Sequence, residues 1–364
     1  MKSCITRFFM NQKLSDIRVQ QHTIFINQGG TAKIAELINQ GLVQKGWDSR
    51  LQGEIDARIG AKTGPTFTDS DLLHIHSTLS WAATLEKCHK NNIRPYITLH
   101  DVTLLTGGCT YPLECTKWKH GCPECHRGYH GSSRTCEDIR HLVATINPVL
   151  ISPSEWLGKM ARQAFPGQTV HIVPNGVKPD VTEEQAMNVL HNFCGRIVLF
   201  VAHGGTDAGY KSGDKWLSIW SRIKKKVPEA RALFIGNRQA NKSGDVLELP
   251  YLPNEAVRGI MQQADVLVYP SMADNHPLVV LEAMMSKLPV VAFAVGGISE
   301  QIRHDQTGIL VRPGDYEELA SQAAKLLKHP AQAKAMARRA RQVALDNFNV
   351  SRMVEDYTKI YEQA

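Results

Sequence analysis

The feature that most constrains the fold is a repeated order of short apolar strand, turn and amphipathic helix. The first run begins with a predicted strand at residues 23–26, a glycine turn, and a helix whose apolar side chains recur at helical spacing. Strand, turn and helix in this order open a layer of α/β structure. Further strands of this run are expected at residues 72–76, 96–100 and 149–152.

The same order starts again in the second half of the chain. Its predicted strands are apolar throughout, as expected of parallel strands that helices cover on both faces. We therefore predict an α/β protein with two Rossmann-like, doubly wound domains that face each other across a cleft. The strands of the second run are expected at residues 197–202, 232–235, 266–270, 290–293 and 309–311.

Length and composition bound the remaining possibilities. The 364 residues accommodate two such domains, and no stretch reaches the roughly 18 apolar residues of a membrane span. The first ten residues lack the apolar core of a secretory signal, so we expect a cytoplasmic protein. The net charge of +7 suits an anionic partner such as a nucleotide diphosphate, a phosphate-bearing lipid or a membrane surface, with peripheral membrane contact left open.

The domain boundaries follow from the positions of these patterns. A connection at residues 171–177, which contains a proline and an Asn-Gly pair, separates the two domains. The last helix is predicted to pack back on the first domain. The predicted parts are an extension at 1–22, an N-terminal domain at 23–170 with a cysteine-rich insertion at 106–136, a C-terminal domain at 171–345 and a final helix at 346–364.

The segment at residues 269–285 places polar residues between a strand and a helix. Pro277 stands where the helix is expected to begin, and Asn275 is a suitable N-cap. The amides of a helix start can hold a diphosphate, while the carboxylates of Glu282 and Asp274 can accept hydrogen bonds from ribose and sugar hydroxyls. Taken alone, an ordinary capped helix with a surface glutamate explains these residues equally well.

Asp274 and Glu282 also resemble the two acidic positions, separated by seven residues, of the retaining glycosyltransferase family 4, which has the GT-B fold. Residues 284–292 and 295–300 match the same family, and the resemblance spans residues 22–330. Family members usually carry Glu where this chain has Asp274. The resemblance implies a donor site at Asp274, Asn275, His276, Pro277, Leu278 and Glu282.

A second match lies at residues 201–213, where the family places an Arg and a Lys that neutralise the donor diphosphate. Lys211 fits the Lys, a point charge on a flexible stem. The Arg position falls on Gly209 or Tyr210, so that partner is missing. The resemblance assigns Gly204, in the same loop, to the donor site.

Two features of the first domain complete the resemblance. The turn containing Gly29 and Gly30 resembles the glycine loop near the donor phosphates, although a tight strand–helix turn explains it equally well. A histidine after the corresponding family strand contacts the donor sugar, which implies that role for His100. The implied catalytic residues are His100, Lys211, Asp274 and Glu282.

A cluster of cysteines marks the predicted insertion. It resembles an insertion in the family 4 enzymes that build bacterial exopolysaccharide, O-antigen and colanic acid. Four thiolates suit tetrahedral Zn²⁺, with His126 or His130 as substitutes, whereas free thiols or disulfides are the alternative. No cofactor for catalysis is expected. The predicted structural zinc ligands are Cys109, Cys115, Cys122 and Cys125.

The resemblance implies transfer of a sugar from a UDP- or GDP-sugar to a glycan acceptor that is lipid-linked. It also implies a role in the bacterial surface polysaccharide and lipopolysaccharide pathways in which such enzymes act. Two alternatives stay open: a sugar-nucleotide epimerase of GT-B architecture, and a non-catalytic protein that binds glycan or nucleic acid. The cysteine cluster lacks the interleaved aromatic and basic residues of a nucleic-acid site, so no nucleic-acid partner is expected.

Overall fold

The computed structural model describes residues 17–26, 28–56, 61–62, 67, 71–125, 128–129, 132–179, 193, 195–202 and 209–363. The chain divides into two compact units. Unit 1 comprises Met1–Val173 and Ser351–Ala364, and unit 2 comprises Pro174–Val350. No helix among the described residues is both long enough and apolar enough to cross a membrane.

Unit 1 contains a seven-stranded sheet in the order β3-β2-β1-β4-β5-β6-β7. All neighbouring strands are parallel except β2 and β3, which are antiparallel. The strands are β1 (Arg18–Phe25), β2 (Asp48–Asp56), β3 (Ala61–Lys62), β4 (Leu72–Ile75), β5 (Tyr96–Thr98), β6 (Val149–Ser152) and β7 (Val170–Ile172).

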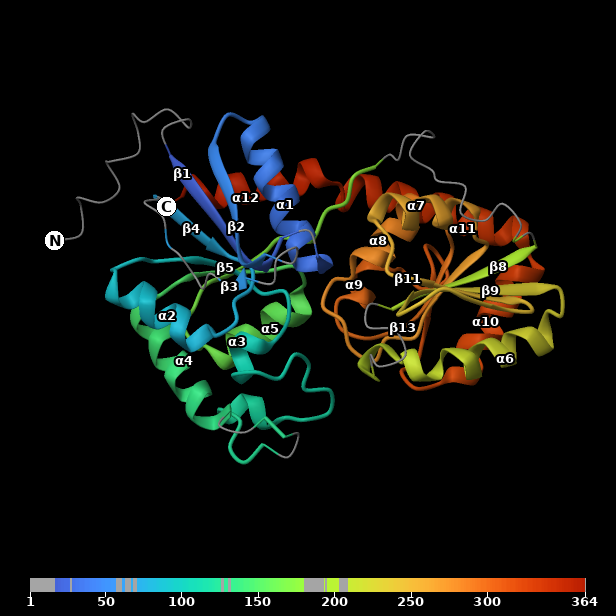
Figure 1. Ribbon diagram of the computed structural model, residues 1–364, viewed down its shortest axis with the longest axis horizontal. Coiled ribbons are helices and arrows are strands. Elements are labelled where there is room, and N and C mark those ends of the chain that lie inside the picture. Colours follow the sequence, from blue (N-terminus) through green and yellow to red (C-terminus); the bar gives the residue numbers. More distant parts are fainter. Residues whose placement is uncertain are drawn as a thin grey trace. The chain divides into compact units, whose positions relative to one another are not determined.

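Helices lie on both sides of this sheet, with α1 and α12 on one side and α2 and α4 on the other (Figure 1). Helices α1 and α12 approach closely, because a Cβ atom added at Gly41 would lie 2.4 Å from a methyl group of Val354. The helical segments of unit 1 are α1 (Gly29–Gln44), α2 (Trp81–Lys90), α3 (Thr103–Thr106), η2 (Lys117–His120), α4 (Ser132–Ile146), α5 (Glu155–Ala164) and α12 (Val350–Tyr361).

Unit 2 repeats the architecture with a second seven-stranded sheet in the order β10-β11-β9-β8-β12-β13-β14. Only the β10–β11 pair is antiparallel among these neighbours. The strands are β8 (Arg196–Val201), β9 (Ala230–Asn237), β10 (Asn241–Ser243), β11 (Val246–Pro250), β12 (Val266–Tyr269), β13 (Val290–Phe293) and β14 (Ile309–Val311).

Two apolar cores cover the two faces of the second sheet. Helices α6 and α10 pack on one face, and α7 and α8 pack on the other (Figure 1). The helical segments are η5 (Gly209–Lys211), η6 (Gly213–Lys215), α6 (Trp216–Lys226), α7 (Asn254–Gln263), α8 (Leu278–Met285), α9 (Ile298–Gln301), α10 (Tyr316–Lys328) and α11 (Pro330–Asn347).

The structure differs from the sequence prediction at the start of the chain and in two hairpins. Strand β1 begins at Arg18, so the predicted extension at 1–22 runs five residues too far. Strand β2 and the β10–β11 hairpin were not expected from the sequence. Their residues are mostly polar or half-buried, and they therefore lack the continuous apolar pattern of the central strands.

Candidate functional site

The loop that follows β12 brings together the acidic and basic residues singled out in unit 2. The hydroxyl of Tyr269, at the end of β12, donates a 2.6 Å hydrogen bond to Oδ2 of Asp274. The same oxygen lies 3.8 Å from Nζ of Lys211 in an ion pair. Asp274 is thus fixed by a neutral donor and by a cation at the carboxyl end of a parallel strand, where α/β proteins place their ligands.

Lys211 reaches this loop because its own backbone is tied to it. The amide of Met272 donates a 2.7 Å hydrogen bond to the carbonyl of Tyr210. The Lys211 side chain is 20% exposed and is therefore partly open to solvent. A charge in this position can neutralise an anionic ligand at the strand end.

Glu282 lies in the second turn of α8 and is 8% exposed. Its Oε1 accepts a 2.5 Å hydrogen bond from Nδ2 of Asn254 in the first turn of α7. The predicted cap of α8 was wrong, because Pro277 rather than Asn275 holds the N-cap position and makes no side-chain cap. The buried side chain of Asn275 lies in the loop before the helix.

His276 is held inside the same loop by hydrogen bonds from two other segments. Nδ2 of Asn175 donates to the His276 carbonyl over 2.9 Å, and Nε2 of Gln301 lies 3.0 Å from the ring Nδ1. Gln301 also donates to the carbonyl of Pro277. The first residue of α8, Leu278, is half-buried. These contacts fix the backbone of the loop from which α8 begins.

In unit 1, His100 follows β5 and its ring is joined to a second histidine. Nε2 of His100 lies 3.0 Å from Nδ1 of His76. Burial lowers the pKa of His100 from its usual 6.5 to about 3, and burial with the neighbouring histidines holds the pKa of His76 well below its usual value. Both rings are therefore neutral at pH 7.

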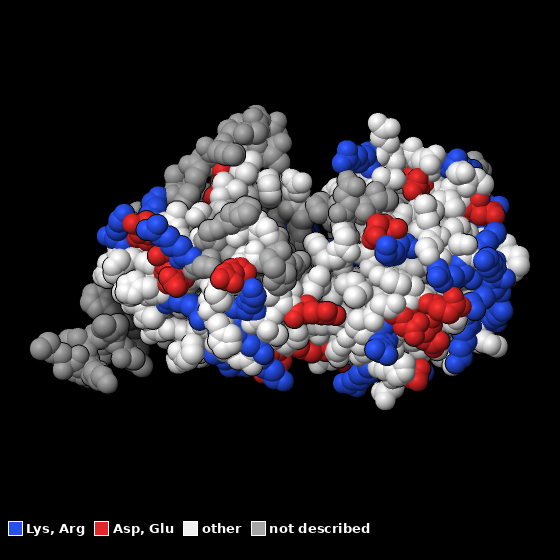
Figure 2. Space-filling model, turned by 90° about the horizontal axis from the view of Figure 1, so that it is seen from below, with Lys and Arg blue, Asp and Glu red and all other residues white. Residues whose placement is uncertain are grey.

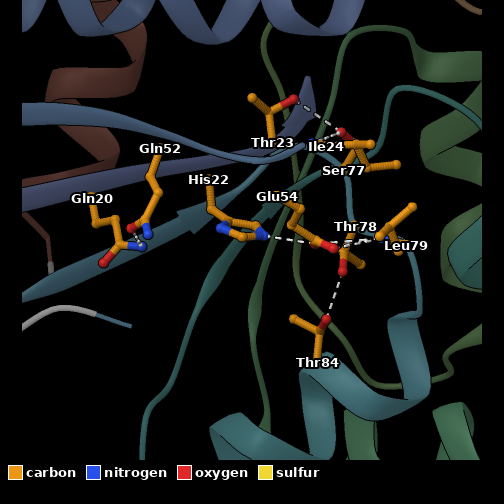
Figure 3. Close-up of polar contacts among 10 residues, drawn as sticks. All are labelled: Gln20, His22, Thr23, Ile24, Gln52, Glu54, Ser77, Thr78, Leu79 and Thr84. Carbon is orange, nitrogen blue, oxygen red and sulfur yellow. Dashed lines mark hydrogen bonds and ion pairs between the residues drawn. The ribbon is translucent and has the colours of Figure 1, made fainter. Parts of the chain in front are cut away.

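A separate buried pair joins β1 and β2. Figure 3 shows Nε2 of His22 pointing to Oε1 of Glu54, 2.9 Å away. Both side chains are at most 1% exposed, and the Leu79 amide also bonds to the Glu54 carboxylate. Burial raises the pKa of Glu54, but hydrogen bonds from His22 and Thr78 outweigh it and lower the pKa below its usual value. Glu54 is thus a buried carboxylate whose charge is compensated locally.

The predicted glycine positions are only partly described. Gly29 begins α1 with φ of 82°, a conformation that favours glycine, and a Cβ atom there would meet nothing within 4 Å. The need for glycine is therefore conformational. Gly30 is exposed in the first turn of the same helix. Gly204 lies outside the described residues.

The predicted zinc site is not supported by the structure. Among the described residues, no group of three or more His, Cys, Asp or Glu side chains is arranged to hold a metal ion. The thiol of Cys109 donates to the carbonyl of Tyr111 within its own loop. Burial, together with the neighbouring Cys136, raises the pKa of Cys122 to about 12. The Cys109 thiol thus has a contact within its own loop, and the buried Cys122 thiol is protonated at pH 7.

Cys115 and Cys125 are half-buried. The substitutes proposed from the sequence, His126 and His130, lie outside the described residues.

Known proteins share both the sequence pattern of unit 2 and the fold of the whole chain. Residues 195–343 match the family model described as glycosyl transferases group 1. The chain is 32% identical to N-acetyl-alpha-D-glucosaminyl L-malate synthase of Bacillus anthracis over 149 residues, 41% of this chain and 35% of that protein. It is 29% identical to trehalose synthase of Pyrococcus horikoshii over 163 residues, 40% and 39% of the two chains. The matches therefore span less than half the length of these relatives.

Among solved structures, sucrose-phosphate synthase from Thermosynechococcus elongatus superposes with a TM-score of 0.72 over 95% of this chain and 98% of that one, at 16% identity. HepE of Anabaena in complex with UDP-glucose gives a TM-score of 0.71 over 95% and 100%, at 14% identity. The fold is GT-B. The group 1 match falls on unit 2, the unit that holds Lys211, Asp274 and Glu282.

Several residues at these sites were missed from the sequence. Tyr269 was noted only as a strand end, and Asn175 only as part of the connection between domains. Asn254, Gln301 and His76 were not singled out at all. Their contacts join segments distant in the chain, and no local spacing indicates such pairs. One signal is available in the sequence, namely a polar residue in or directly after an otherwise apolar strand. His74 lies in β4, and His76 directly follows it.

Proposed function

We propose that this GT-B protein is a retaining glycosyltransferase of the family 4 type, with a nucleotide-diphosphate sugar as donor. The observation that carries the proposal is the convergence of Lys211 and Asp274 after β12, beside the helix that carries Glu282, within the segment that matches the group 1 family. The Anabaena HepE complex, in which a protein of the same fold holds UDP-glucose, supports a donor of this class.

Each residue has a chemical role in the proposed site. Lys211 neutralises the diphosphate, the amides at the start of α8 bind its oxygens, and both stabilise the charge that develops on the leaving phosphate. Glu282 accepts hydrogen bonds from the ribose hydroxyls. Asp274 accepts one from the sugar, and His100 of unit 1 contacts the sugar as the resemblance implies.

The proposed reaction needs no dedicated protein base. The bond between the anomeric carbon and the phosphate oxygen breaks, and the acceptor oxygen forms its bond on the same face of the sugar. The acceptor proton passes to the leaving diphosphate. The arrangement accounts for retention of configuration without a covalent intermediate.

The acceptor is proposed from the resemblance and from charge. A net charge of +7 suits an anionic, phosphate-bearing acceptor such as a lipid-linked glycan at a membrane surface. We place the reaction in the building of bacterial surface polysaccharide, with the protein acting in the cytoplasm and in peripheral contact with the membrane.

A donor screen tests the proposal. UDP-, GDP- and dTDP-sugars are titrated into the protein by calorimetry, and hydrolysis and transfer are followed by product analysis. We expect one donor to bind, and Glu282→Gln to weaken its binding at least tenfold, because a hydrogen bond to a charged acceptor contributes about 1.5–3 kcal/mol. Glu318→Gln, on the exposed side of α10, is the matched control.

The outcomes discriminate between the alternatives. Absence of binding by every sugar nucleotide contradicts the proposal. Formation of an isomeric sugar nucleotide without any acceptor would indicate an epimerase. Binding of glycan without hydrolysis or transfer would indicate a non-catalytic protein.

A further inference from the structure

Asn254 makes a side-chain contact that joins α7 to α8 within unit 2. It is the first residue of α7, after Pro253, which holds the N-cap position and makes no side-chain cap. An asparagine stabilises its own helix best from the N-cap position itself. Asn254 lies one residue beyond that position, and its Nδ2 donates a hydrogen bond to Oε1 of Glu282 over 2.5 Å. The side chain therefore serves a contact between two helices.

The direction of this hydrogen bond is fixed by the two groups that form it. A carboxylate only accepts hydrogen bonds, and the nitrogen of an amide only donates them. The reversed amide would place Oδ1 of Asn254 against Oε1 of Glu282, which brings two acceptors into contact. Asn254 therefore presents its nitrogen to the carboxylate, and this bond cannot reverse as a bond between two hydroxyl groups can.

The core of unit 2 fixes the backbones on both sides of this contact. Helices α7 and α8 lie on the same face of the sheet (Figure 1), and Val257 and Ile260 of α7 belong to the same apolar core as Leu281, the residue before Glu282. The freedom that remains is in the long side chain of Glu282. A hydrogen bond that holds this side chain before a ligand arrives removes the cost of ordering it on binding.

The bond from Asn254 leaves the carboxylate able to bind a ligand. A carboxylate has about four acceptor sites on its two oxygens, so it can accept from Asn254 and from other donors together. Glu282 is 8% exposed and Asn254 is half-buried. Hydrogen bonds to this carboxylate are therefore only partly weakened by water.

We propose that Asn254 is a positioning residue that holds the Glu282 carboxylate in the orientation in which it accepts hydrogen bonds from the ribose of the donor. The inference rests on the proposed function, in which Glu282 binds the ribose, and deepens it by naming the nucleoside class. A deoxyribose has one hydroxyl fewer to donate than ribose. The site should favour ribonucleoside diphosphates over their deoxy forms, and this preference should depend on Asn254.

Calorimetry tests this dependence. The Kd values of UDP, GDP and their 2′-deoxy and 3′-deoxy forms are measured for the native protein and for Asn254→Leu, which keeps the approximate size of the side chain and removes the donor. We expect the native protein to bind a ribose form about tenfold more tightly than at least one deoxy form. In Asn254→Leu the ribose form should weaken about fivefold and that deoxy form much less. A residue that only stabilised the fold would weaken both by the same factor.

Asn241→Leu is the matched control. Nδ2 of Asn241 also donates to a glutamate, over 3.0 Å to Oε2 of Glu248, in the β10–β11 hairpin of the same unit. Asn241 is exposed, and neither residue belongs to the proposed site. This variant should leave every Kd unchanged.

Asn254→Asp gives a second test at the same position. It keeps the shape of the side chain but places a carboxylate opposite Glu282, and like charges repel. An acidic residue in the first turn of a helix is favourable, so we expect this variant to fold even if Asn254→Leu does not. It should reduce the preference for ribose at least as much as Asn254→Leu, whereas a residue that only filled space would be replaced without effect.

The kinetics of donor hydrolysis separate positioning from a direct part in the reaction. The ribose does not react, so its hydrogen bonds are the same in the ground state and in the transition state. Asn254→Leu should therefore raise the KM of the nucleotide sugar and leave kcat nearly unchanged. A fall in kcat at constant KM would contradict a role at the ribose.

The outcomes separate the inference from the function on which it rests. If neither UDP nor GDP binds to the native protein, the proposed function fails and the inference fails with it. If one of them binds but the native protein does not distinguish it from its deoxy forms, the donor site stands and the inference is overturned. An unchanged preference for ribose in folded Asn254→Leu or Asn254→Asp would overturn it in the same way.

Discussion

The two units share one architecture but place their buried polar groups differently. In unit 1 polar side chains run through the sheet itself, with residues such as Gln21, His74 and Thr98 wholly or almost wholly buried in three of its strands. In unit 2 the central strands β8, β12 and β13 are apolar, and buried polar side chains gather in the loop and helix after β12, as with Asp274, His276 and Glu282.

This difference has a physical consequence. In unit 1 the buried polar groups that contact His100 also connect the sheet to α12, so a change there should alter stability as well. In unit 2 the apolar cores on both faces of the sheet stabilise the fold, and the charged loop lies beyond the strand ends. Changes at that loop should therefore alter binding with little effect on unfolding.

The largest expected effect is a selective loss of unit 1 in acid. Burial lowers the pKa of His74 and His100 from 6.5 to about 3. The unfolded chain therefore takes up protons as the pH falls through 6.5, whereas the folded one does not until about pH 3. Stability is full above pH 6.5 and falls below it, by about 3 kcal/mol for each of the two residues at pH 4.5.

The other groups near these histidines mostly act in the same direction. The pKa of His76 lies well below its usual value through burial, and the lowered pKa of Glu54 also removes stability as the pH falls. Asp101, whose pKa is raised by burial, offsets part of this loss. The buried histidines and Glu54 therefore together destabilise unit 1 as the pH falls.

Hydrogen exchange with mass spectrometry measures this difference, after correction for the intrinsic pH dependence of exchange. Between pH 7 and pH 4.5, peptides from β4 and β5 should lose protection before those from β12 and β13. Equal loss of protection in the two units would show that the buried polar side chains of unit 1 do not make it more sensitive to acid than unit 2.

The second prediction compares the shared hydrogen bonds of His74, Thr98 and Tyr357 with the single hydrogen bond of an ordinary buried hydroxyl group. Thr98→Val keeps the side-chain shape but leaves Nε2 of His74 and the hydroxyl of Tyr357 without their shared partner. We expect a loss of about 3 kcal/mol in the free energy of unfolding, measured in urea. Thr358→Val is the control, because its hydroxyl only donates to a carbonyl four residues earlier in α12, and it should cost much less. Equal costs would contradict the idea of a cooperative network.

The same contrast explains what the sequence could and could not predict. The apolar strands of unit 2 were expected nearly to the residue: residues 290–293 and 309–311 agree with β13 and β14. Their continuous apolar runs are the pattern of strands buried on both faces. Strand β1 was predicted to begin five residues too late, because its first residues, Arg18 to His22, are mostly polar although the structure buries most of them.

For the candidate site in unit 2, the sequence indicated residues on two separate segments, 201–213 and 269–285. Asp274, Glu282 and Lys211 were named from spacing and resemblance, and the structure brings Lys211 to Asp274. The supporting contacts join separate segments. Asn254 bonds to Glu282, and Gln21 bonds to Tyr361, which lies 340 residues further along the chain. No periodicity or motif reports such pairs, because they depend on how the elements pack.

The third effect concerns binding without stability. Tyr269→Phe removes the hydroxyl that donates to Asp274 and leaves the apolar ring in the core. We expect the donor Kd to rise about fivefold, which corresponds to about 1 kcal/mol, with little change in unfolding. Thr307→Val removes a buried hydroxyl from the same unit and should leave the Kd unchanged. A Tyr269→Phe protein that loses stability but binds normally would show that this hydroxyl supports the fold and not the site.

The smallest effect is expected where charge lies on the surface. On the face shown in Figure 2, Lys and Arg side chains are interspersed with Asp and Glu. Glu317 of α10 pairs at 3.0 Å with both Arg222 and Lys226 of α6, yet its side chain is 60% exposed, against 12% for Asp274 in its pair with Lys211. Water and salt screen such exposed pairs, and holding long side chains in place offsets their attraction. Glu317→Gln should therefore leave the Tm and the donor Kd unchanged at low and at high salt. A fall in Tm as large as that of Thr98→Val would contradict the view that buried neutral hydrogen bonds, more than exposed charges, distinguish the stability of the two units.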